Sequence, residues 1–148
     1  MTSNELTTAR TLTIAALAGV KQAGQSYGIS GRSKTAATLA DLQMDLFWTV
    51  AGGADPIKLI TENKGRYKLM HVKDMKSQAR FSGDGGNVQQ WMALFGEMTN
   101  VGEGVLDLKN ILAAAKANGM EHFIIEQDIV KNPEVALKIC VDNFKKLV

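Results

Sequence analysis

From residue 42 onward, short apolar runs alternate with segments whose apolar residues recur at helical spacing. The apolar runs cover Leu42–Thr49, Tyr67–Val72 and Glu121–Gln127. Each run has the length of a strand rather than that of a helix. We therefore predict three strands, each followed by a helix.

The three helices are predicted from the residues at their ends. Asp55 and Pro56 suit a helix start. The aspartate can cap free N–H groups, and the N–H that proline lacks would have no intrahelical partner at this position. Gly65 is expected to end this helix. Asp107 and Gly119 bracket the second helix, and an Asn-Pro-Glu triplet starts the third. The alternation favours parallel strands with right-handed crossovers, in an open doubly wound sheet or in part of a barrel.

A long polar segment, 74–104, separates the second predicted strand from the second predicted helix. Within it, only Val88 to Met98 has apolar residues at helical spacing. A connection of this length in a compact domain is usually functional or disordered. We therefore expect it either to contribute to function or to lack a fixed structure.

The first 40 residues differ in composition from the rest. Alanine, glycine, serine and threonine supply 23 of them, together with four basic residues and one acidic residue, whereas residues 41–148 carry 13 basic and 14 acidic residues. We predict two regions, 1–40 and 41–148. The first contains a helix from about Thr7 to Ala23 and is otherwise irregular, poorly ordered or loosely docked.

The overall composition limits the classes of protein. The 148 residues carry 17 basic and 15 acidic side chains, mostly interspersed, so we expect no nucleic-acid partner. The apolar run Leu12–Val20 is too short to cross a bilayer as a helix, so we expect no membrane partner. The only cysteine, Cys140, can form no internal disulfide. A cytoplasmic location is expected, with a secreted or periplasmic one left open.

Chemically active side chains stand at or near the carboxyl end of each predicted strand. They are Asp45, His71 and Glu126. In parallel α/β folds these strand ends share the edge that holds active sites. Two carboxylates and one imidazole suit a divalent ion, with Mn²⁺, Mg²⁺, Co²⁺ and Zn²⁺ as candidates. The alternative is structural: the carboxylates cap helices or pair with charges, and His71 is a hydrogen-bonded core residue.

Six short motifs between Leu42 and Val148 occur in the order and spacing of one known family. They are Leu42-Gln-Met-Asp45-Leu-Phe-Trp48, Gly52-Gly-Ala-Asp55-Pro56, Gly65-Arg66, His71-Val-Lys-Asp74, Val101-Gly-Glu-Gly104 with Asp107, and Ile124-Ile-Glu126-Gln-Asp128. In these motifs the chain resembles the sugar phosphate isomerase/epimerase family, which has a xylose isomerase-like TIM barrel. The resemblance implies that residues 42–148 form the last three strand-helix units of a (β/α)8 barrel. It does not extend to the first 40 residues.

The resemblance also implies roles for individual residues. The family's metal-binding aspartate, histidine and glutamate on its last three strands fall on Asp45, His71 and Glu126. Glu126 would in addition act as a catalytic acid/base, moving a proton on the carbon next to a sugar carbonyl that the ion polarises. Trp48 and Lys73 are the candidate contacts to a sugar or sugar phosphate substrate. The alternative for Trp48 is core or rim packing, and the alternative for Lys73 is a solvated loop position.

The chain departs from the family in one respect. The family's fourth metal ligand, which is also the partner acid/base, is a glutamate on its fifth strand; here the only glutamate before Asp45 is Glu5, in no strand-like setting. We therefore expect the chain to be the C-terminal part of such an enzyme, active only if another polypeptide provides the missing strands. Three strands would also leave two open sheet edges, which favour self-association.

Two other functions are compatible with the sequence. One is a non-catalytic product, either truncated or acting as a self-associating interaction domain, which the composition of the first 40 residues favours. The other is a phosphodiester hydrolase of the AP endonuclease type. That chemistry uses several zinc ions and more histidines than the two in this chain, so it is the weaker alternative.

Overall fold

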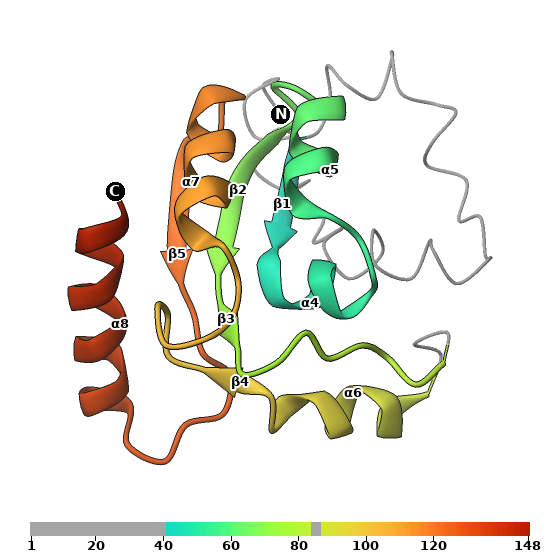
Figure 1. Ribbon diagram of the computed structural model, residues 1–148, viewed down its shortest axis with the longest axis vertical. Helices are drawn as coiled ribbons and strands as arrows, with labels where there is room; N and C mark the ends of the chain where they lie inside the picture. The colour runs from blue at the N-terminus through green and yellow to red at the C-terminus, as the bar shows by residue number, and fades with distance from the viewer. Residues whose placement is uncertain (1–40, 84–86) are drawn as a thin grey trace, which may run out of the picture.

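The computed structural model describes residues 41–83 and 87–148, and every structural statement below concerns those residues. The helix predicted between Thr7 and Ala23 lies outside them. The elements in chain order are β1 (Leu42–Asp45), α4 (Leu46–Ala51), α5 (Pro56–Glu62), β2 (Tyr67–Val72), β3 (Asp74–Met75), α6 (Val88–Phe95), β4 (Met98–Thr99), α7 (Leu108–Ala117), β5 (His122–Ile125) and α8 (Pro133–Leu147) (Figure 1).

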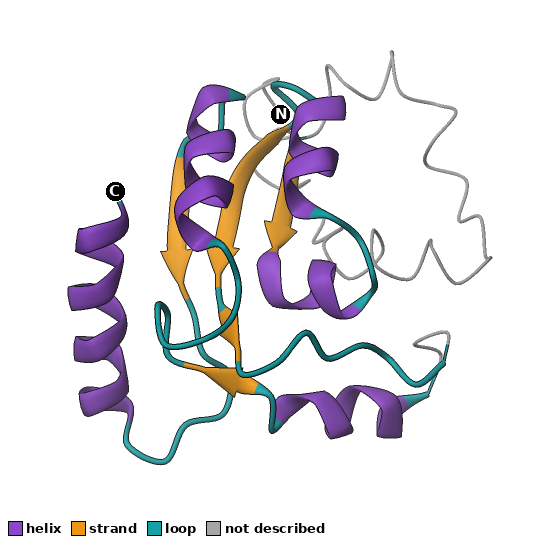
Figure 2. Ribbon diagram, in the orientation of Figure 1, coloured by secondary structure: helices purple, strands orange, loops and turns teal. Residues whose placement is uncertain are grey.

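The three longest strands form one parallel sheet in the order β1, β2, β5 (Figure 2). Asp45 of β1 lies opposite His71 of β2, which in turn lies opposite Ile124 of β5. Helices link these strands, as parallel pairing requires. The predicted α/β class is confirmed: the described residues form part of a TIM-barrel-like fold, with an open sheet and no closed barrel.

Two of the predicted strands are shorter in the structure. Leu42–Thr49 was predicted as one strand, but β1 ends at Asp45 and Leu46–Ala51 is helix α4. The physical reason is the Asp45 side chain, which accepts a hydrogen bond from the backbone N–H of Trp48 and so caps a new helix. The third predicted strand, 121–127, is shorter in the structure, where β5 covers only His122–Ile125. Its carboxyl end is set by its partner β2, whose last residue, Val72, pairs with Ile125.

The predicted helix starts are confirmed by their caps. Asp55, Asp107 and Asn132 each accept a hydrogen bond from a backbone N–H in the first turn of α5, α7 and α8. Gly65 and Gly119 follow α5 and α7 with φ of 77° and 90°, a backbone conformation that side chains other than glycine disfavour. Local signals therefore set the boundaries of these helices.

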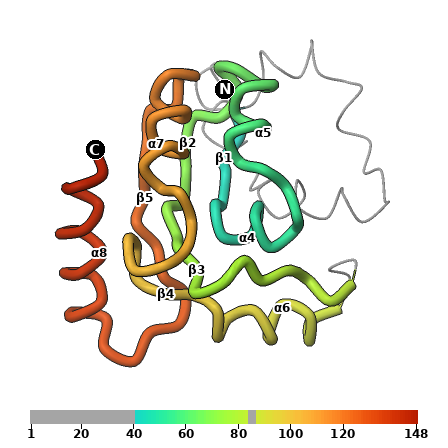
Figure 3. Tube along the Cα trace, in the orientation of Figure 1, coloured from blue at the N-terminus to red at the C-terminus, as the bar shows by residue number. Residues whose placement is uncertain are grey.

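The apolar core lies between the sheet and the helices that cover one of its faces. Helices α5 and α7 stand side by side over this face, and α8 packs on α7 (Figures 1 and 3). Met70 and Val72 of β2 are fully buried beneath them, together with Phe47 of α4. Among the described residues, no helix is long and apolar enough to span a membrane.

The long segment after β2 contains regular elements in the residues that the structure describes. Its strands β3 and β4 pair antiparallel, with α6 between them in the chain. The buried carboxylate of Asp74 accepts hydrogen bonds from the backbone N–H groups of Met75, Gly102, Gly104 and Leu106, at 2.9 to 3.3 Å. Asp74 thereby fixes the 100–106 loop to the carboxyl end of β2.

Candidate metal centre

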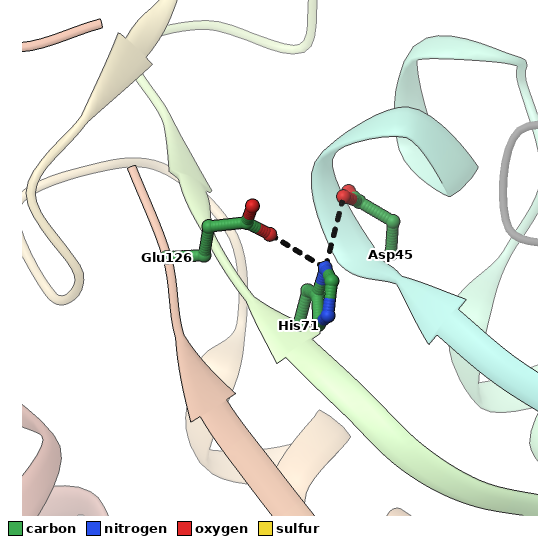
Figure 4. Close-up of side chains that lie close together, drawn as sticks. All are labelled: Asp45, His71 and Glu126. Atoms are coloured by element: carbon green, nitrogen blue, oxygen red, sulfur yellow. Dashed lines mark ion pairs between the residues drawn. The ribbon is translucent and has the colours of Figure 1, made fainter. Parts of the chain in front are cut away.

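The three predicted metal ligands meet at the carboxyl edge of the parallel sheet (Figure 4). Asp45 ends β1, His71 is the second-to-last residue of β2, and Glu126 directly follows β5. His71 Nδ1 lies 2.5 Å from Glu126 Oε2 and 3.8 Å from Asp45 Oδ2. One ligand atom from each residue lies within 4.8 Å of the other two. The parallel register therefore brings together the residues that the sequence pattern singled out.

The two oxygens of Asp45 face different partners. Oδ1 accepts the hydrogen bond from the backbone N–H of Trp48, at 3.0 Å, and so caps α4. Oδ2 faces His71 and Lys73. The structural interpretation of Asp45 as a helix cap is thus correct for one oxygen, while the other oxygen is directed into the site.

A buried lysine completes the charged cluster. The side chain of Lys73 is only 4% exposed, and its Nζ lies 3.0 Å from Asp45 Oδ2 and 3.2 Å from Glu126 Oε2. The same Nζ donates to Asp128 Oδ2 at 2.7 Å. The sequence predicted Lys73 as a substrate contact; the structure places its ammonium among three carboxylates.

Gln43 is a site residue that the sequence interpretation missed. Its side chain is buried, and its Nε2 lies 2.8 Å from His71 Nε2 and 3.3 Å from His71 Nδ1. The amide therefore lies across the edge of the imidazole that carries both nitrogens. One feature of the sequence could have identified it. Gln43 lies two residues before Asp45, and alternate residues of a strand share one face of the sheet, so both side chains point to the same side.

The charges of the cluster shift the pKa values of its basic groups. Pairing with the Asp45 carboxylate raises the pKa of His71; desolvation opposes this, and the negative charge of Glu126 adds to it. For Lys73, burial lowers the pKa, but the charge of Asp45 and the hydrogen bond to Asp128 outweigh it and leave the pKa raised. Both groups are thus held in their protonated forms more firmly than in water.

The donor set fits a single divalent ion. Two carboxylate oxygens and one imidazole nitrogen are common protein ligands for such ions. Bonds of about 2.0–2.2 Å place two ligands of one ion at most about 4.4 Å apart, so only small side-chain rotations are needed. Glu126 Oε2 is buried, and the basic side chains of His71 and Lys73 lie 2.5 Å and 3.2 Å from it. Such an oxygen is suited to a cation.

Trp48, the other predicted substrate contact, lies in an aromatic cluster. Its ring is 9% exposed and packs against Phe47, Phe81, Trp91 and Phe95, with ring centroids 4.7 to 5.9 Å apart. The cluster joins α4 to α6 and to the loop before α6. In the described structure the Trp48 ring thus packs within this cluster, while the Trp48 backbone N–H donates a hydrogen bond to Asp45.

No protein-family model matches the sequence, and neither does any protein with curated annotation. Among solved structures, the crystal structure of the probable 3-DHS dehydratase AsbF, involved in petrobactin synthesis from Bacillus anthracis, is similar, with a TM-score of 0.53 and 15% sequence identity. The similarity covers 72% of this chain and 39% of that chain. At this identity it shows the fold alone. It supports the predicted partial TIM-barrel-like fold and does not show membership of the isomerase/epimerase family.

Proposed function

We propose that this chain binds a divalent metal ion through Asp45, His71 and Glu126, as the metal-binding part of a sugar or sugar phosphate isomerase or epimerase. The observation that carries the proposal is the meeting of three ligand atoms at the carboxyl edge of a parallel sheet. In parallel α/β folds this edge holds the active site. The expected ion is Mn²⁺, Mg²⁺, Co²⁺ or Zn²⁺, and the two oxygen ligands favour the harder ions.

The chemistry that suits these residues is proton transfer next to a carbonyl. A bound ion would polarise the substrate carbonyl. Glu126 would take a proton from the neighbouring carbon and return it, a role that the position of its Oε2 beside His71 supports. Lys73 and Trp48 remain the proposed substrate contacts. Since AsbF is described as a dehydratase, a different reaction class, the shared fold does not select the reaction.

The complete reaction is expected to need more than this chain. The matched region corresponds to 39% of the AsbF chain, and the family's second acid/base glutamate has no counterpart among the described residues that form the site. We therefore propose that residues 41–148 bind metal without turning over substrate, and that turnover requires the remaining barrel strands and a second acid/base glutamate.

Isothermal titration calorimetry with Mn²⁺ tests the metal site. His71→Ala should lower the affinity at least about tenfold, because it removes one of three ligands. His122→Ala is the matched control, since the other histidine of the chain is exposed at the opposite end of the same sheet and should leave the affinity unchanged. Equal affinities in the two variants, or no binding by the wild-type chain, would contradict the proposal.

A second candidate function is self-association, which the open sheet favours. Among the described residues, β1 and β5 each pair only with β2, so each has an unpaired edge. Exposed apolar side chains accompany these edges: Ile124 of the edge strand β5 is 44% exposed, and Leu137 of α8 is 56% exposed. We infer that copies of the chain associate through these edges. Light scattering should show a mass that rises with concentration and falls in Ile124→Lys; a monomer at all concentrations would exclude this function.

A further inference from the structure

A buried ammonium already lies where the proposed metal ion would need to be. Lys73 Nζ lies 3.0 Å from Asp45 Oδ2 and 3.2 Å from Glu126 Oε2, which are the oxygens that face His71. A divalent ion bonded to both oxygens would be within a few ångströms of this ammonium. Two positive charges at that separation repel each other, and the burial of Lys73 and Asp45 reduces the screening of this repulsion by water. Lys73 therefore cannot keep its position when the ion binds.

Lys73 also has a partner outside the proposed ligand set. Its shortest ion pair is with Asp128 Oδ2, at 2.7 Å. Asp128 follows Glu126 by two residues, and its side chain is 28% exposed, so it lies at the border between the buried cluster and solvent. A lysine that left Asp45 and Glu126 would keep this ion pair. Pairing of the ammonium with Asp128 alone would therefore be compatible with an ion bound to Asp45 and Glu126.

We propose that Lys73 is an exchangeable internal counter-ion of the metal centre. It neutralises Asp45 and Glu126 in the metal-free protein, and it pairs with Asp128 alone when a divalent ion binds. The inference rests on the proposed metal-binding function. It adds that two residues which are not ligands, Lys73 and Asp128, set the affinity of the site for the ion. Lys73 competes with the ion, whereas Asp128 favours the ion by stabilising the displaced ammonium.

The test is Mn²⁺ binding to the full 148-residue chain, measured by calorimetry in four proteins: wild type, Lys73→Met, Asp128→Asn and the double variant. Lys73→Met should raise the affinity about tenfold or more, because the competing cation is gone. Asp128→Asn should lower it about fivefold, because the displaced ammonium loses its partner. In the Lys73→Met background, Asp128→Asn should change the affinity less than about twofold.

Lys68→Met is the matched control. Lys68 lies on the same strand as the site, pairs with Glu121 at 2.7 Å, and lies at the amino end of β2. Its removal changes the net charge of the chain as much as Lys73→Met does. It should leave the Mn²⁺ affinity unchanged, which separates a local exchange from a general charge effect.

The outcomes distinguish this inference from the function on which it rests. If the wild-type chain binds no Mn²⁺ and Lys73→Met binds none either, the metal function is wrong. If the wild type binds but Lys73→Met binds no tighter, Lys73 does not compete and the exchange is wrong. If Asp128→Asn has the same effect with and without Lys73, Asp128 acts through its own charge, which also overturns the exchange. Circular dichroism checks folding; should Lys73→Met not fold, Lys73→Gln replaces it in both backgrounds.

Discussion

The two ends of the parallel sheet carry the same residue types in different surroundings. At the amino end, Lys68 pairs with Glu121 while 31% and 59% of their side chains are exposed, and His122 next to them is also exposed. At the carboxyl end, Lys73 pairs with Asp45 while only 4% and 7% are exposed. Water and salt screen the first pair, whereas the second has lost its hydration. A lysine, a histidine and a carboxylate become a candidate site only where strand ends and burial bring them together.

The largest expected difference between the two ends is in stability. Lys73→Ala should lower the free energy of unfolding of the metal-free chain by about 3 kcal/mol, because it leaves the buried Asp45 carboxylate without its lysine partner. Lys68→Ala removes a pair at the exposed end and should leave the free energy of unfolding nearly unchanged. Urea denaturation of both variants measures the difference. Similar losses in the two variants would show that burial does not separate the two ends.

The carboxyl end is also expected to be sensitive to added volume. A Cβ atom at Gly104 would clash with Asp74 Oδ1 and with the backbone oxygen of Met75, whereas a Cβ at Gly96 would meet no heavy atom within 4 Å. Gly104→Ala should therefore cost about 1–3 kcal/mol of unfolding free energy by displacing the loop that Asp74 holds. Gly96→Ala is the control and should fall within about 0.5 kcal/mol of the wild type in the same denaturation experiment. A tolerated Gly104→Ala would mean that this loop adapts freely.

A smaller effect is expected from Gln43, which lies against the imidazole of His71. Gln43→Leu should weaken Mn²⁺ binding about tenfold, because groups that orient a ligating histidine contribute to affinity on this scale. Gln43→Glu keeps a polar partner for the ring and should retain most of the affinity. Gln78→Leu, at an exposed position, serves as the control. Calorimetry would contradict the orienting role if Gln43→Leu and Gln78→Leu bound Mn²⁺ equally.

The fold was predictable wherever local signals agree with the tertiary structure. The caps at Asp55 and Asp107 and the glycine at 119 act within a few residues, so the sequence predicted α5 and α7 closely. Helix α4 was missed because a short apolar run is compatible with both a strand and a buried helix. The deciding interaction is the hydrogen bond between Asp45 and the backbone of Trp48, which composition and periodicity do not reveal.

The site was predictable only as far as strand ends determine it. Asp45, His71 and Glu126 were expected to meet because parallel strands end at one edge, and the structure brings them within 4.8 Å. The contacts of Lys73 and Gln43 depend on the register between strands and on the depth of each side chain. A single sequence does not contain that information, so the ammonium among the carboxylates emerges only from the structure.

The subtlest expected difference concerns pH. Because the pKa of His71 is raised in the fold, its protonation stabilises the metal-free chain fully below its ordinary value of about 6.5 and progressively less as pH rises through the raised value. The stability advantage of the wild type over His71→Gln, measured by urea denaturation without metal, should therefore shrink as pH rises through this window. An advantage that is constant or grows with pH would contradict the assigned direction. Mn²⁺ affinity should change in the opposite direction and increase over the same window, because the ligating nitrogen must lose its proton before it can bind the ion.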